Sequence, residues 1–353
     1  MKRYYLLFSC LLFWMCKKET STTLVFPVDP NLPCDWIETI TPPSGFTLEK
    51  VSAIEENVNL DDIQMLNDEV GYLLAGNNKG GYAEVYKTVD GGHTWQDLNL
   101  IEREIPYGLF FLNEKEGWIS YFANQGNILK TIDGGKTWAS ITFDNLNGHL
   151  RDFAQNSKGA IFAMLSGLNV NPSIIKSVDQ GKSWELFYEE EPVDFSIFRS
   201  GFHLTEQYIY LTTQSGALIK LDFEGNQIAK MPLPIDLLWD VNILDDENFI
   251  LVGNEEAVKS NNGGQDWEEI HSATARIIQF NHPAEGWMIL NKTGCGGDVY
   301  QVMDVLAYTE DGGESWQESE MRTNLMIDYN NHYQKENGDF LILFGKSVFE
   351  LQQ

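Results

Sequence analysis

The stretch Thr88-Val89-Asp90-Gly91-Gly92-His93-Thr94-Trp95 decides the fold, because it recurs along the chain. Residues 131–138 repeat it almost letter for letter, and further copies occupy residues 177–184, 260–267 and 309–316. The Trp residues that end successive copies are 43, 46, 83 and 49 positions apart, so the interval of 83 holds two periods. A decayed copy, Lys220-Leu221-Asp222-Phe223-Glu224-Gly225-Asn226, lies where the missing one belongs.

Each copy has the residues of a tight turn followed by an aromatic residue. An Asp can accept hydrogen bonds from backbone N–H groups a few residues on, and a Gly at the fifth position supplies a positive φ. The Trp begins the outgoing strand and packs between neighbouring sheets. The turn is predicted to be structural, since one turn copied through a repeat fold is a folding device before it is a site. The acidic or amide residue and the Trp of each copy are Asp90 and Trp95, Asp133 and Trp138, Asp179 and Trp184, Asn262 and Trp267, and Asp311 and Trp316.

Short apolar runs rich in aromatic and β-branched residues precede each copy, for example at residues 71–75 and 117–121. Each period holds four such strands, and the copy joins the third to the fourth. Six blades follow from the copies, and residues 325–329, 339–343 and 348–351 supply three strands of a seventh. Its outer strand is expected from residues 36–40 or 46–48, which closes the ring. The sequence predicts an all-β fold, a seven-bladed β-propeller of four-stranded antiparallel blades.

The repeated pattern resembles the Asp-box, also called the bacterial neuraminidase repeat, from about residue 55 to the end of the chain. In length, in blade count and in the residues of its repeated T-x-D-G-G-x-T-W motif, the chain is similar to the photosystem II stability/assembly factor family. That resemblance implies a non-catalytic, exported platform that binds partner proteins. Members of the family hold their partner with a basic patch, whereas this chain has 52 Asp and Glu against 24 Lys and Arg, so the photosynthetic role is not carried over.

Composition excludes several classes of function. The 353 residues are 43% hydrophobic, which is enough for a folded core. A formal charge of −28 excludes binding to nucleic acid and electrostatic docking on anionic lipid. The six His residues lack metal-ligand spacing, and no G-x-S-x-G or phosphate-loop motif occurs. No metal, cofactor or catalytic residue is predicted, and a monomer is expected.

The first residues have the pattern of an export signal. Lys2 and Arg3 precede an apolar run over residues 4–15 that stops at Cys16. This resembles a bacterial lipoprotein signal, with Cys16 acylated; acylation at Cys10 and a plain cleaved leader are the alternatives. The expected division is a signal peptide over 1–15, a lipid-anchored tether over 16–34 and the propeller over 35–353. The expected location is the bacterial cell envelope, on its periplasmic side or surface, with the N-terminal lipid as the only membrane contact.

Two Cys residues remain after the leader, Cys34 and Cys295. In an oxidising compartment they have one possible intramolecular pairing, so a disulfide is predicted, with two unpaired buried thiols as the alternative.

The candidate ligand site lies on the face opposite the repeated turns, where the chain enters the innermost strands. Charged and aromatic residues at the mouth of a propeller channel commonly hold a ligand, here an envelope protein or a glycan. Solvated loop ends or internal ion pairs are the alternative. The candidate residues are Tyr107, Arg151, Arg199, Trp239, Asp240 and Arg276.

The alternative function is a glycoside hydrolase of the sialidase type. Sialidases are similar in their repeat, and they use three Arg residues for the sugar carboxylate and a Tyr nucleophile. Arg151, Arg199 and Arg276 could imitate the triad, with Tyr107 or Tyr329 as the nucleophile. The F-R-I-P motif that precedes the first repeat in sialidases is absent, so a non-catalytic binding platform is preferred.

Overall fold

A computed structural model of the chain describes most of the region from residue 47 to residue 352. The chain divides into two compact units, Met1–Asp35 with Thr293–Val302, and Trp36–Lys292 with Met303–Gln353. The strands belong to the second unit, apart from the terminal residues Thr293 and Val302. The described residues are 47–54, 58–77, 82–101, 106–121, 127–142, 149–167, 170–189, 201–213, 216–235, 237–293, 302–318, 332–335, 338–344 and 347–352.

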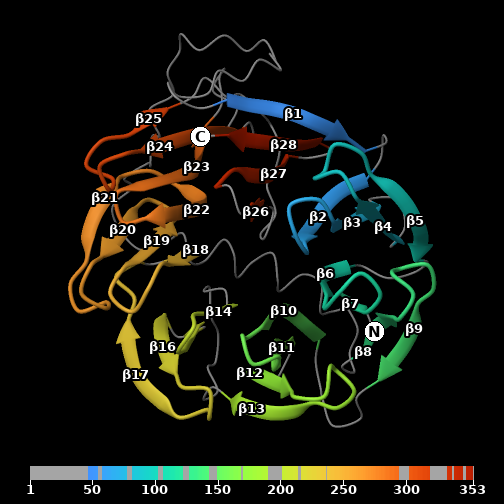
Figure 1. The fold of residues 1–353 in the computed structure, drawn as a ribbon. Coiled ribbons are helices and arrows are strands. Elements are labelled where there is room, and N and C mark those ends of the chain that lie inside the picture. The colour runs from blue at the N-terminus through green and yellow to red at the C-terminus, as the bar shows by residue number, and fades with distance from the viewer. Residues whose placement is uncertain are drawn as a thin grey trace, which may run out of the picture. The chain divides into compact units, whose positions relative to one another are not determined.

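These residues form seven four-stranded sheets arranged around a central axis, which confirms the predicted seven-bladed propeller (Figure 1). Neighbouring strands are antiparallel in every sheet, and in six of the seven sheets their order follows the chain from an innermost strand at the axis to an outermost strand at the rim. None of the described residues forms a helix long and apolar enough to cross a membrane.

The first three blades run from β2 to β13. Their strands are β2 (Val58–Met65), β3 (Gly71–Asn77), β4 (Tyr82–Thr88), β5 (Gln96–Ile101), β6 (Pro106–Phe111), β7 (Gly117–Tyr121), β8 (Asn127–Thr131), β9 (Ala139–Thr142), β10 (His149–Gln155), β11 (Ile161–Gly167), β12 (Val170–Ser177) and β13 (Glu185–Glu189).

The fourth to sixth blades run from β14 to β25. Their strands are β14 (Gly201–Leu204), β15 (Ile209–Thr212), β16 (Ala217–Leu221), β17 (Gln227–Pro232), β18 (Leu238–Ile243), β19 (Phe249–Gly253), β20 (Ala257–Ser260), β21 (Glu268–His271), β22 (Ala275–His282), β23 (Glu285–Thr293), β24 (Val302–Thr309) and β25 (Gln317–Glu318).

The seventh blade is built from both ends of the described chain. It contains β26 (His332–Gln334), β27 (Phe340–Phe344), β28 (Ser347–Gln352) and, outermost, β1 (Thr47–Ala53). β1 pairs with β28 in antiparallel register, with Thr47 opposite Gln352 and Ala53 opposite Ser347. The predicted closure by an N-terminal strand is confirmed, and β1 overlaps the second of the two predicted segments. The predicted strand at residues 325–329 lies outside the described residues.

The core lies between neighbouring sheets because the middle strands are apolar on both faces. All five residues of β7 are buried, and so are all five of β19. The outermost strands β9 and β17 are mostly exposed, which fits their position at the rim. Trp118 of β7 and Trp287 of β23 are among the largest fully buried side chains. Burial of apolar surface between the blades stabilises the ring, because each Å² removed from water contributes about 25 cal/mol of free energy.

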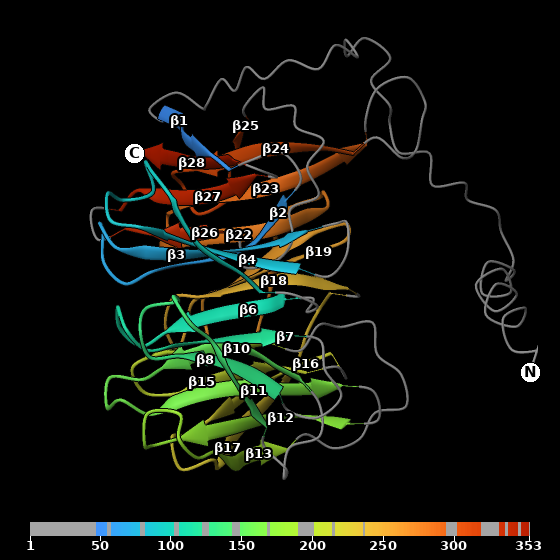
Figure 2. The same cartoon turned by 90° about the vertical axis from the view of Figure 1, so that its right-hand side faces the viewer.

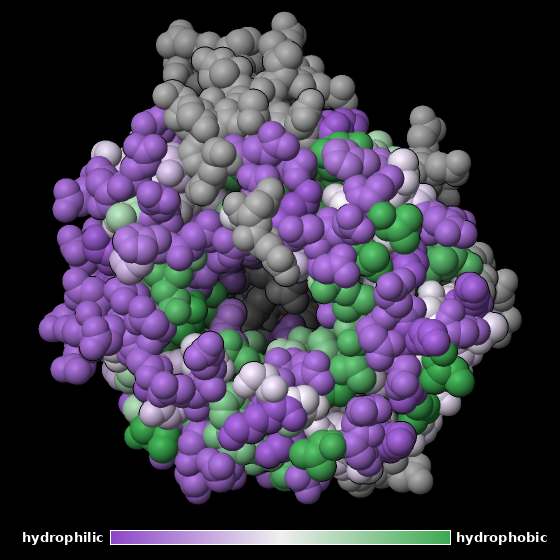
Figure 3. All heavy atoms as spheres, in the orientation of Figure 1, coloured by the Kyte–Doolittle hydropathy of each residue, from purple (hydrophilic) through white to green (hydrophobic). Residues whose placement is uncertain are grey.

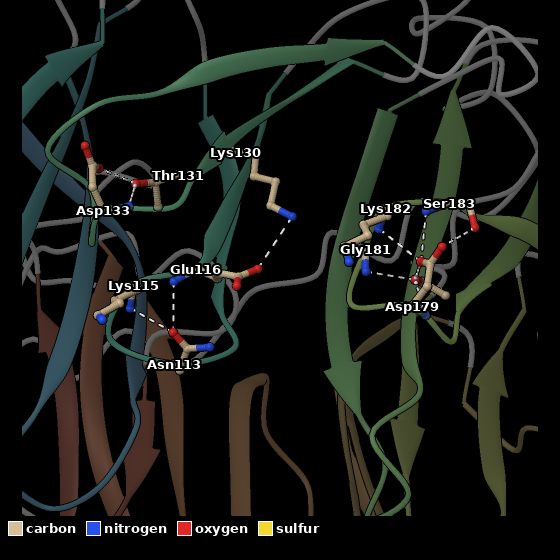
Figure 4. A network of polar contacts seen from close by, with 11 residues as sticks. Asn113, Lys115, Glu116, Lys130, Thr131, Asp133, Asp179, Gly181, Lys182 and Ser183 are labelled. Atoms are coloured by element: carbon tan, nitrogen blue, oxygen red, sulfur yellow. Dashed lines mark hydrogen bonds and ion pairs between the residues drawn. The ribbon is translucent and has the colours of Figure 1, made fainter.

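In five of the described blades the repeated turn joins the third strand to the fourth, as predicted (Figure 4). In the second blade the Thr131 hydroxyl donates to Asp133 Oδ1 at 2.9 Å and accepts from Gly135 N at 2.8 Å. The Thr137 N–H and hydroxyl donate to the two Asp133 carboxylate oxygens at 2.9 and 2.6 Å. The bonds from Thr137 are the main cause that lowers the pKa of Asp133 to about 2. The turn is thus a closed network of hydrogen bonds, with Gly135 at φ 87°.

The decayed copy in the fourth blade keeps part of this network. Asn226 N and Nδ2 donate to the two carboxylate oxygens of Asp222, both at 2.8 Å. Asn226 thereby stands where four of the other turns have Ser or Thr and the fifth blade has Asp266, and the predicted position of this copy between β16 and β17 is confirmed.

The Trp that ends each turn packs between blades, as predicted. Trp95 Nε1 donates to Ser52 Oγ of β1 at 3.1 Å, and Trp316 Nε1 donates to the Ile270 carbonyl oxygen of β21 at 2.9 Å. Each of these bonds reaches the outermost strand of the preceding blade. The repeated turn therefore stabilises the contact between blades as well as its own hairpin.

The two faces of the propeller carry different parts of the chain. First and third strands run parallel to each other, and the third strands end at the repeated turns, which define one face (the turn face). β28 also ends on this face, at the left of Figure 2, and Figure 3 looks onto it. The first strands consequently begin at the opposite face (the entry face), where the candidate ligand residues were predicted.

Candidate functional site

A cavity of about 380 Å³ occupies the axis of the propeller, and all seven innermost strands line it. Figure 3 shows the hollow at the centre of the molecule. Its volume lies within the ~300–1,000 Å³ that is usual for ligand sites. The polar side chains in its lining are Asp62, Gln64, Asp152, His203, Thr212, Asp240, Arg276 and His332, and Trp239 adds an aromatic ring.

The innermost strands share an irregularity near the entry face. The pairing with the second strand shifts between Pro106 and Gly108, between Leu238 and Asp240, and between Ala275 and Ile277. The residues skipped at these shifts are Tyr107, Trp239 and Arg276, three of the predicted site residues. A β-bulge bends its strand and redirects the side chain, and bulges are frequent beside binding sites.

Not every predicted residue can be placed in the cavity. Trp239, Asp240 and Arg276 line it. Arg151 lies in β10 and Tyr107 in β6, but the structure describes only their backbone. Arg199 lies outside the described residues, as do Cys34 and Cys295 of the predicted disulfide and Cys16 of the predicted lipid anchor.

Arg276 and Trp239 form a pair from neighbouring blades. The guanidinium carbon of Arg276 lies 4.9 Å from the centre of the Trp239 ring, a distance at which a cation is attracted to the ring face. Both side chains are half-buried. Arg276 Nε is buried and has no hydrogen-bond partner within the described part of the chain. Among the described residues that line the cavity, Arg276 carries the single permanent positive charge.

Asp62 and Asp240 connect neighbouring blades at the wall of the cavity. Asp62 Oδ1 accepts from Ile63 N at 2.9 Å, and its Oδ2 accepts from Leu109 N of the next blade at 2.8 Å. Burial away from water raises the pKa of the Asp62 carboxyl to about 8, against these two backbone hydrogen bonds, which lower it. The Asp62 carboxyl therefore stays protonated and neutral up to a much higher pH than the carboxyl of an exposed Asp.

Asp240 repeats this arrangement four blades further on. Its Oδ1 accepts from Val241 N at 2.8 Å and its Oδ2 from Ile278 N of the next blade at 3.0 Å. Burial raises the pKa of Asp240 to about 7. The bond to the neighbouring strand shows that Asp240, predicted as a ligand residue with an internal ion pair as the alternative, has a structural role through backbone hydrogen bonds.

Two residues after each of these carboxyls, an amide side chain makes a second connection to the next blade. Gln64 Oε1 accepts from Phe111 N at 2.5 Å, and its Nε2 donates to the Phe111 carbonyl oxygen at 3.0 Å. In the fifth blade, Asn242 Oδ1 accepts from Phe280 N at 3.1 Å. Sequence reasoning missed this pair of connections. The signal was present as Asp-x-Gln at 62–64 and Asp-x-Asn at 240–242, on corresponding innermost strands.

Sequence reasoning also missed the two His residues of the cavity. Burial lowers the pKa of His203 to about 4, although the charge of Asp152 raises it, and burial lowers the pKa of His332 to about 4. His332 Nε2 lies 3.2 Å from Gln279 Oε1. Both rings are therefore neutral at pH 7, and they leave Arg276 as the cation of the lining.

The described residues of the cavity offer groups that can bind a ligand. Among the described residues no group of three or more His, Cys, Asp or Glu could hold a metal ion. Of the Arg triad considered for a sialidase, only the Arg276 side chain is described. A cation stacked on an aromatic ring, beside backbone-bonded carboxyls, suits recognition of oxygen acceptors on a ligand.

Comparisons with known proteins agree with the fold. The model of the family described as photosynthesis system II assembly factor YCF48 matches residues 47–151. A solved structure of YCF48 bound to a D1 peptide has a TM-score of 0.64 at 18% identity, over 87% of this chain and 94% of that one. YCF48 from Cyanidioschyzon merolae has a TM-score of 0.60 at 14% identity, over 86% of this chain and 98% of that one.

The fold is also shared by a protein with a different origin. The computationally designed Ika8 protein has a TM-score of 0.51 at 7% identity, over 86% of this chain and 98% of that chain. No curated protein sequence matches. At these identities the solved structures establish the architecture alone.

The predicted location, lipid-anchored in the bacterial cell envelope, is contradicted by these matches. The family model and two of the matching structures belong to photosystem II assembly factors and not to envelope lipoproteins. The error has a physical origin, because a short apolar run after Lys2 and Arg3 is a property of export signals in general and does not specify a membrane. The chain is a seven-bladed β-propeller that resembles the photosystem II assembly factor YCF48.

Proposed function

We propose that this chain is a non-catalytic propeller that binds a segment of a partner protein at the entry face of its central cavity. The observation that carries the proposal is the Arg276–Trp239 pair, which places a half-buried cation and an aromatic face at the wall of a ligand-sized cavity. The similar structure of YCF48 with a D1 peptide supports a protein segment as the ligand.

The charges of the lining favour a segment that offers oxygen acceptors. Arg276 can donate to carbonyl or carboxylate oxygens, while burial of Asp62 and Asp240 raises their pKa and so reduces the negative charge opposing it. Trp239 adds an apolar surface on which a backbone or side chain can pack.

Binding of a fluorescein-labelled D1 peptide, measured by fluorescence anisotropy, tests the proposal. The wild-type chain should bind, and Arg276→Gln should raise the Kd by about tenfold or more, as expected for an Arg that contacts the ligand at a binding site. Ile132→Asn on the turn face is the matched control and should leave the Kd unchanged. Absence of binding, or an unchanged Kd in the Arg276→Gln variant with a normal melting curve, would contradict the proposal.

An assay on fluorogenic sialosides and β-glucan oligosaccharides tests the enzymatic alternative. We expect no turnover above that of buffer. Turnover by the wild-type chain that disappears in Arg276→Ala would replace the binding role with a glycosidase.

A further inference from the structure

A second hollow, with a volume of about 500 Å³, lies between the fourth and fifth blades on the turn face, and we call it the β17 groove. Strands β15, β16 and β17 line one side, and the turns of the fifth blade with the start of β19 line the other. The Tyr210 hydroxyl donates to Asp246 Oδ1 across the two blades at 2.5 Å, and Lys220 Nζ lies 3.2 Å from the same oxygen. The groove is therefore one surface, built by two blades in direct contact.

The two repeat units that form the β17 groove are those that depart from the repeated turn. The fourth blade has the decayed copy. The fifth has Asn262 in place of the Asp and Asp266 in place of the Ser or Thr, whereas the other four copies keep both residues. Departures from a local rule that the rest of a repeat follows are expected at functional sites.

An aliphatic side chain in the groove is exposed although the packing of the blades does not require it. The pairing of β17 with β16 skips Ile228, whose side chain is 54% exposed. In the third and fifth blades the residue skipped in the outermost strand, Phe187 or Ile270, instead lies against a turn glycine of the next blade. In the fourth blade Met231 has this contact, because its Sδ lies 3.0 Å from a Cβ placed on Gly264. The bulge thus directs Ile228 into the groove.

The polar groups of the β17 groove include carboxylate oxygens that no described residue occupies. Lys220 is the single cation among the described lining residues, and its ammonium is paired with Asp246 and lies 3.7 Å from the Tyr208 ring centre. Both contacts of Asp246 use Oδ1, so its Oδ2 remains without a polar contact in the described part of the chain. Glu247 is exposed beside it.

The charges of both signs in the groove leave it acidic. Its lining holds Asp246 and Glu247 against Lys220. The strands and turns that supply the lining add Asp245 and Asp266 against Lys230, which is exposed and outside the lining. An excess of negative charge therefore remains after the pair of Lys220 and Asp246 is counted, and it matches the charge of −28 on the whole chain.

We propose that the β17 groove binds a basic segment of a partner protein through a Lys or Arg side chain. The methylene groups of that side chain pack on Ile228 and Met231, and its charged end donates to Asp246 Oδ2 and Glu247. Among the described residues β17 lies at the edge of its sheet, so an extended segment can lie along it (Figure 1). The groove is on the face opposite the entry to the cavity, so the inference goes beyond the proposed function.

Other occupants fit the β17 groove less well. An anionic bilayer would be repelled by its carboxylates and by the charge of the chain. A second copy carries the same net charge of −28 and would be repelled likewise. A basic segment of a different protein satisfies both the aliphatic and the acidic part of the groove.

A selection from a library of displayed random peptides tests the inference. The full chain is the target, and peptides that also bind the groove variant Ile228→Ser, Glu247→Lys are removed. The variant should fold, since Ile228 is exposed and the second blade has Lys115 at the position of Glu247, and its melting curve checks this. Ligands of the central cavity bind both proteins and are removed, so failure of the proposed function does not affect the result.

The control variant Leu186→Ser, Glu224→Lys makes the same changes of charge and apolar surface outside the groove. Leu186 is 55% exposed in β13, and Glu224 is exposed in the decayed turn. Fluorescein-labelled copies of the enriched peptides are then measured by fluorescence anisotropy against the wild type and the two variants.

We expect the enriched peptides to contain Lys or Arg. The groove variant should bind them about tenfold more weakly than the wild type, the control variant should bind them equally well, and about 0.5 M salt should weaken binding. Enrichment of neutral or acidic peptides, no enrichment, or the same loss in the control variant would overturn the inference. So would n-butylguanidine that binds as tightly as the peptides, or self-association of the chain that the groove variant abolishes, because the occupant would then be a small cation or a second copy.

Discussion

A single buried hydroxyl organises each repeated turn. Thr131 is 1% exposed, and its oxygen accepts the Gly135 N–H at 2.8 Å while donating to Asp133. Ser or Thr has this role in each of the five repeated turns of the described blades. The hydroxyl and the Asp133 carboxylate accept from different backbone N–H groups, those of Gly135 and Thr137, and the hydrogen bond from Thr131 to Asp133 links the two groups.

Replacing Thr131 with Val tests this dependence while preserving the shape of the side chain. The Gly135 N–H loses its buried acceptor, so the free energy of unfolding should fall by about 1–3 kcal/mol. Urea denaturation followed by Trp fluorescence measures the loss. Ile132→Val, one residue along and exposed, is the control and should cause no measurable loss. Equal stability of Thr131→Val and the wild type would show that the hydroxyl is dispensable.

The titratable groups of the cavity make stability depend on pH with opposite signs. The pKa of Asp62 is raised to about 8 and that of Asp240 to about 7, so the folded chain binds more protons than the unfolded one, and stability falls as pH rises from about 4 to those values. His203 and His332 have their pKa lowered to about 4, so stability is lost as pH falls from about 6.5 to about 4. Between pH 4 and 6.5 the two effects oppose each other, and above pH 6.5 the carboxyls act alone.

We therefore predict that the free energy of unfolding decreases between pH 6.5 and pH 8, by at most about 1.4 kcal/mol per pH unit for each carboxyl. Asp62→Asn should make this decrease smaller, and the exposed Glu206→Gln should not. Urea denaturation at a series of pH values measures the slope. An identical slope in wild type and Asp62→Asn would mean that this carboxyl keeps its charge in the folded protein.

Contacts between blades, at the scale of elements, depend on glycines in the turns. Gly181 of the third blade has φ 73°, and a Cβ placed on it would lie 2.4 Å from Cζ2 of Trp118 in β7 of the second blade. Trp118 is fully buried, so it cannot move aside without loss of packing. The glycine permits both the turn and the close approach of two neighbouring sheets.

Gly181→Ala should cost more than about 3 kcal/mol, because left-handed strain and a steric clash add. Gly159→Ala is the matched control, since Gly159 has φ 83° but the nearest atom to a Cβ there is 3.9 Å away. It should cost only the strain of about 1–2 kcal/mol. Equal losses of the free energy of unfolding for the two variants, measured by urea denaturation, would contradict the predicted steric clash with Trp118.

The sequence predicted the elements better than the connections between them. The repeated turn identifies the third and fourth strands directly, because its hydrogen bonds join residues only two to four positions apart and so leave a local pattern in the sequence. The Lys87 ammonium instead pairs with Glu114 of the next blade at 2.8 Å and lies 5.5 Å from the Tyr72 ring centre. Such a contact joins residues from different repeats, which no local pattern displays. The hydrogen bonds of Asp62 and Gln64 to the next innermost strand were missed for the same reason.

At the scale of the whole molecule, closure of the ring creates the site. β1 completes the seventh sheet by pairing with β28, and seven innermost strands then surround one cavity. Counting strands predicted the closure, and the entry of the chain into the innermost strands predicted Trp239, Asp240 and Arg276. The sequence could not predict that His203 and His332 line the cavity, because this follows from the arrangement of the blades around the axis.

Photo-crosslinking of the D1 peptide to the full chain tests the central claim of a ligand site at the entry face most directly. A benzophenone amino acid is placed at position 212 on the cavity wall, which leaves the Arg276–Trp239 pair in place, or at position 261, an exposed position on the turn face. The account predicts a crosslinked product from position 212 that excess unlabelled peptide suppresses, and none from position 261. Crosslinking at position 261 alone, or at neither position, would contradict a binding site at the cavity.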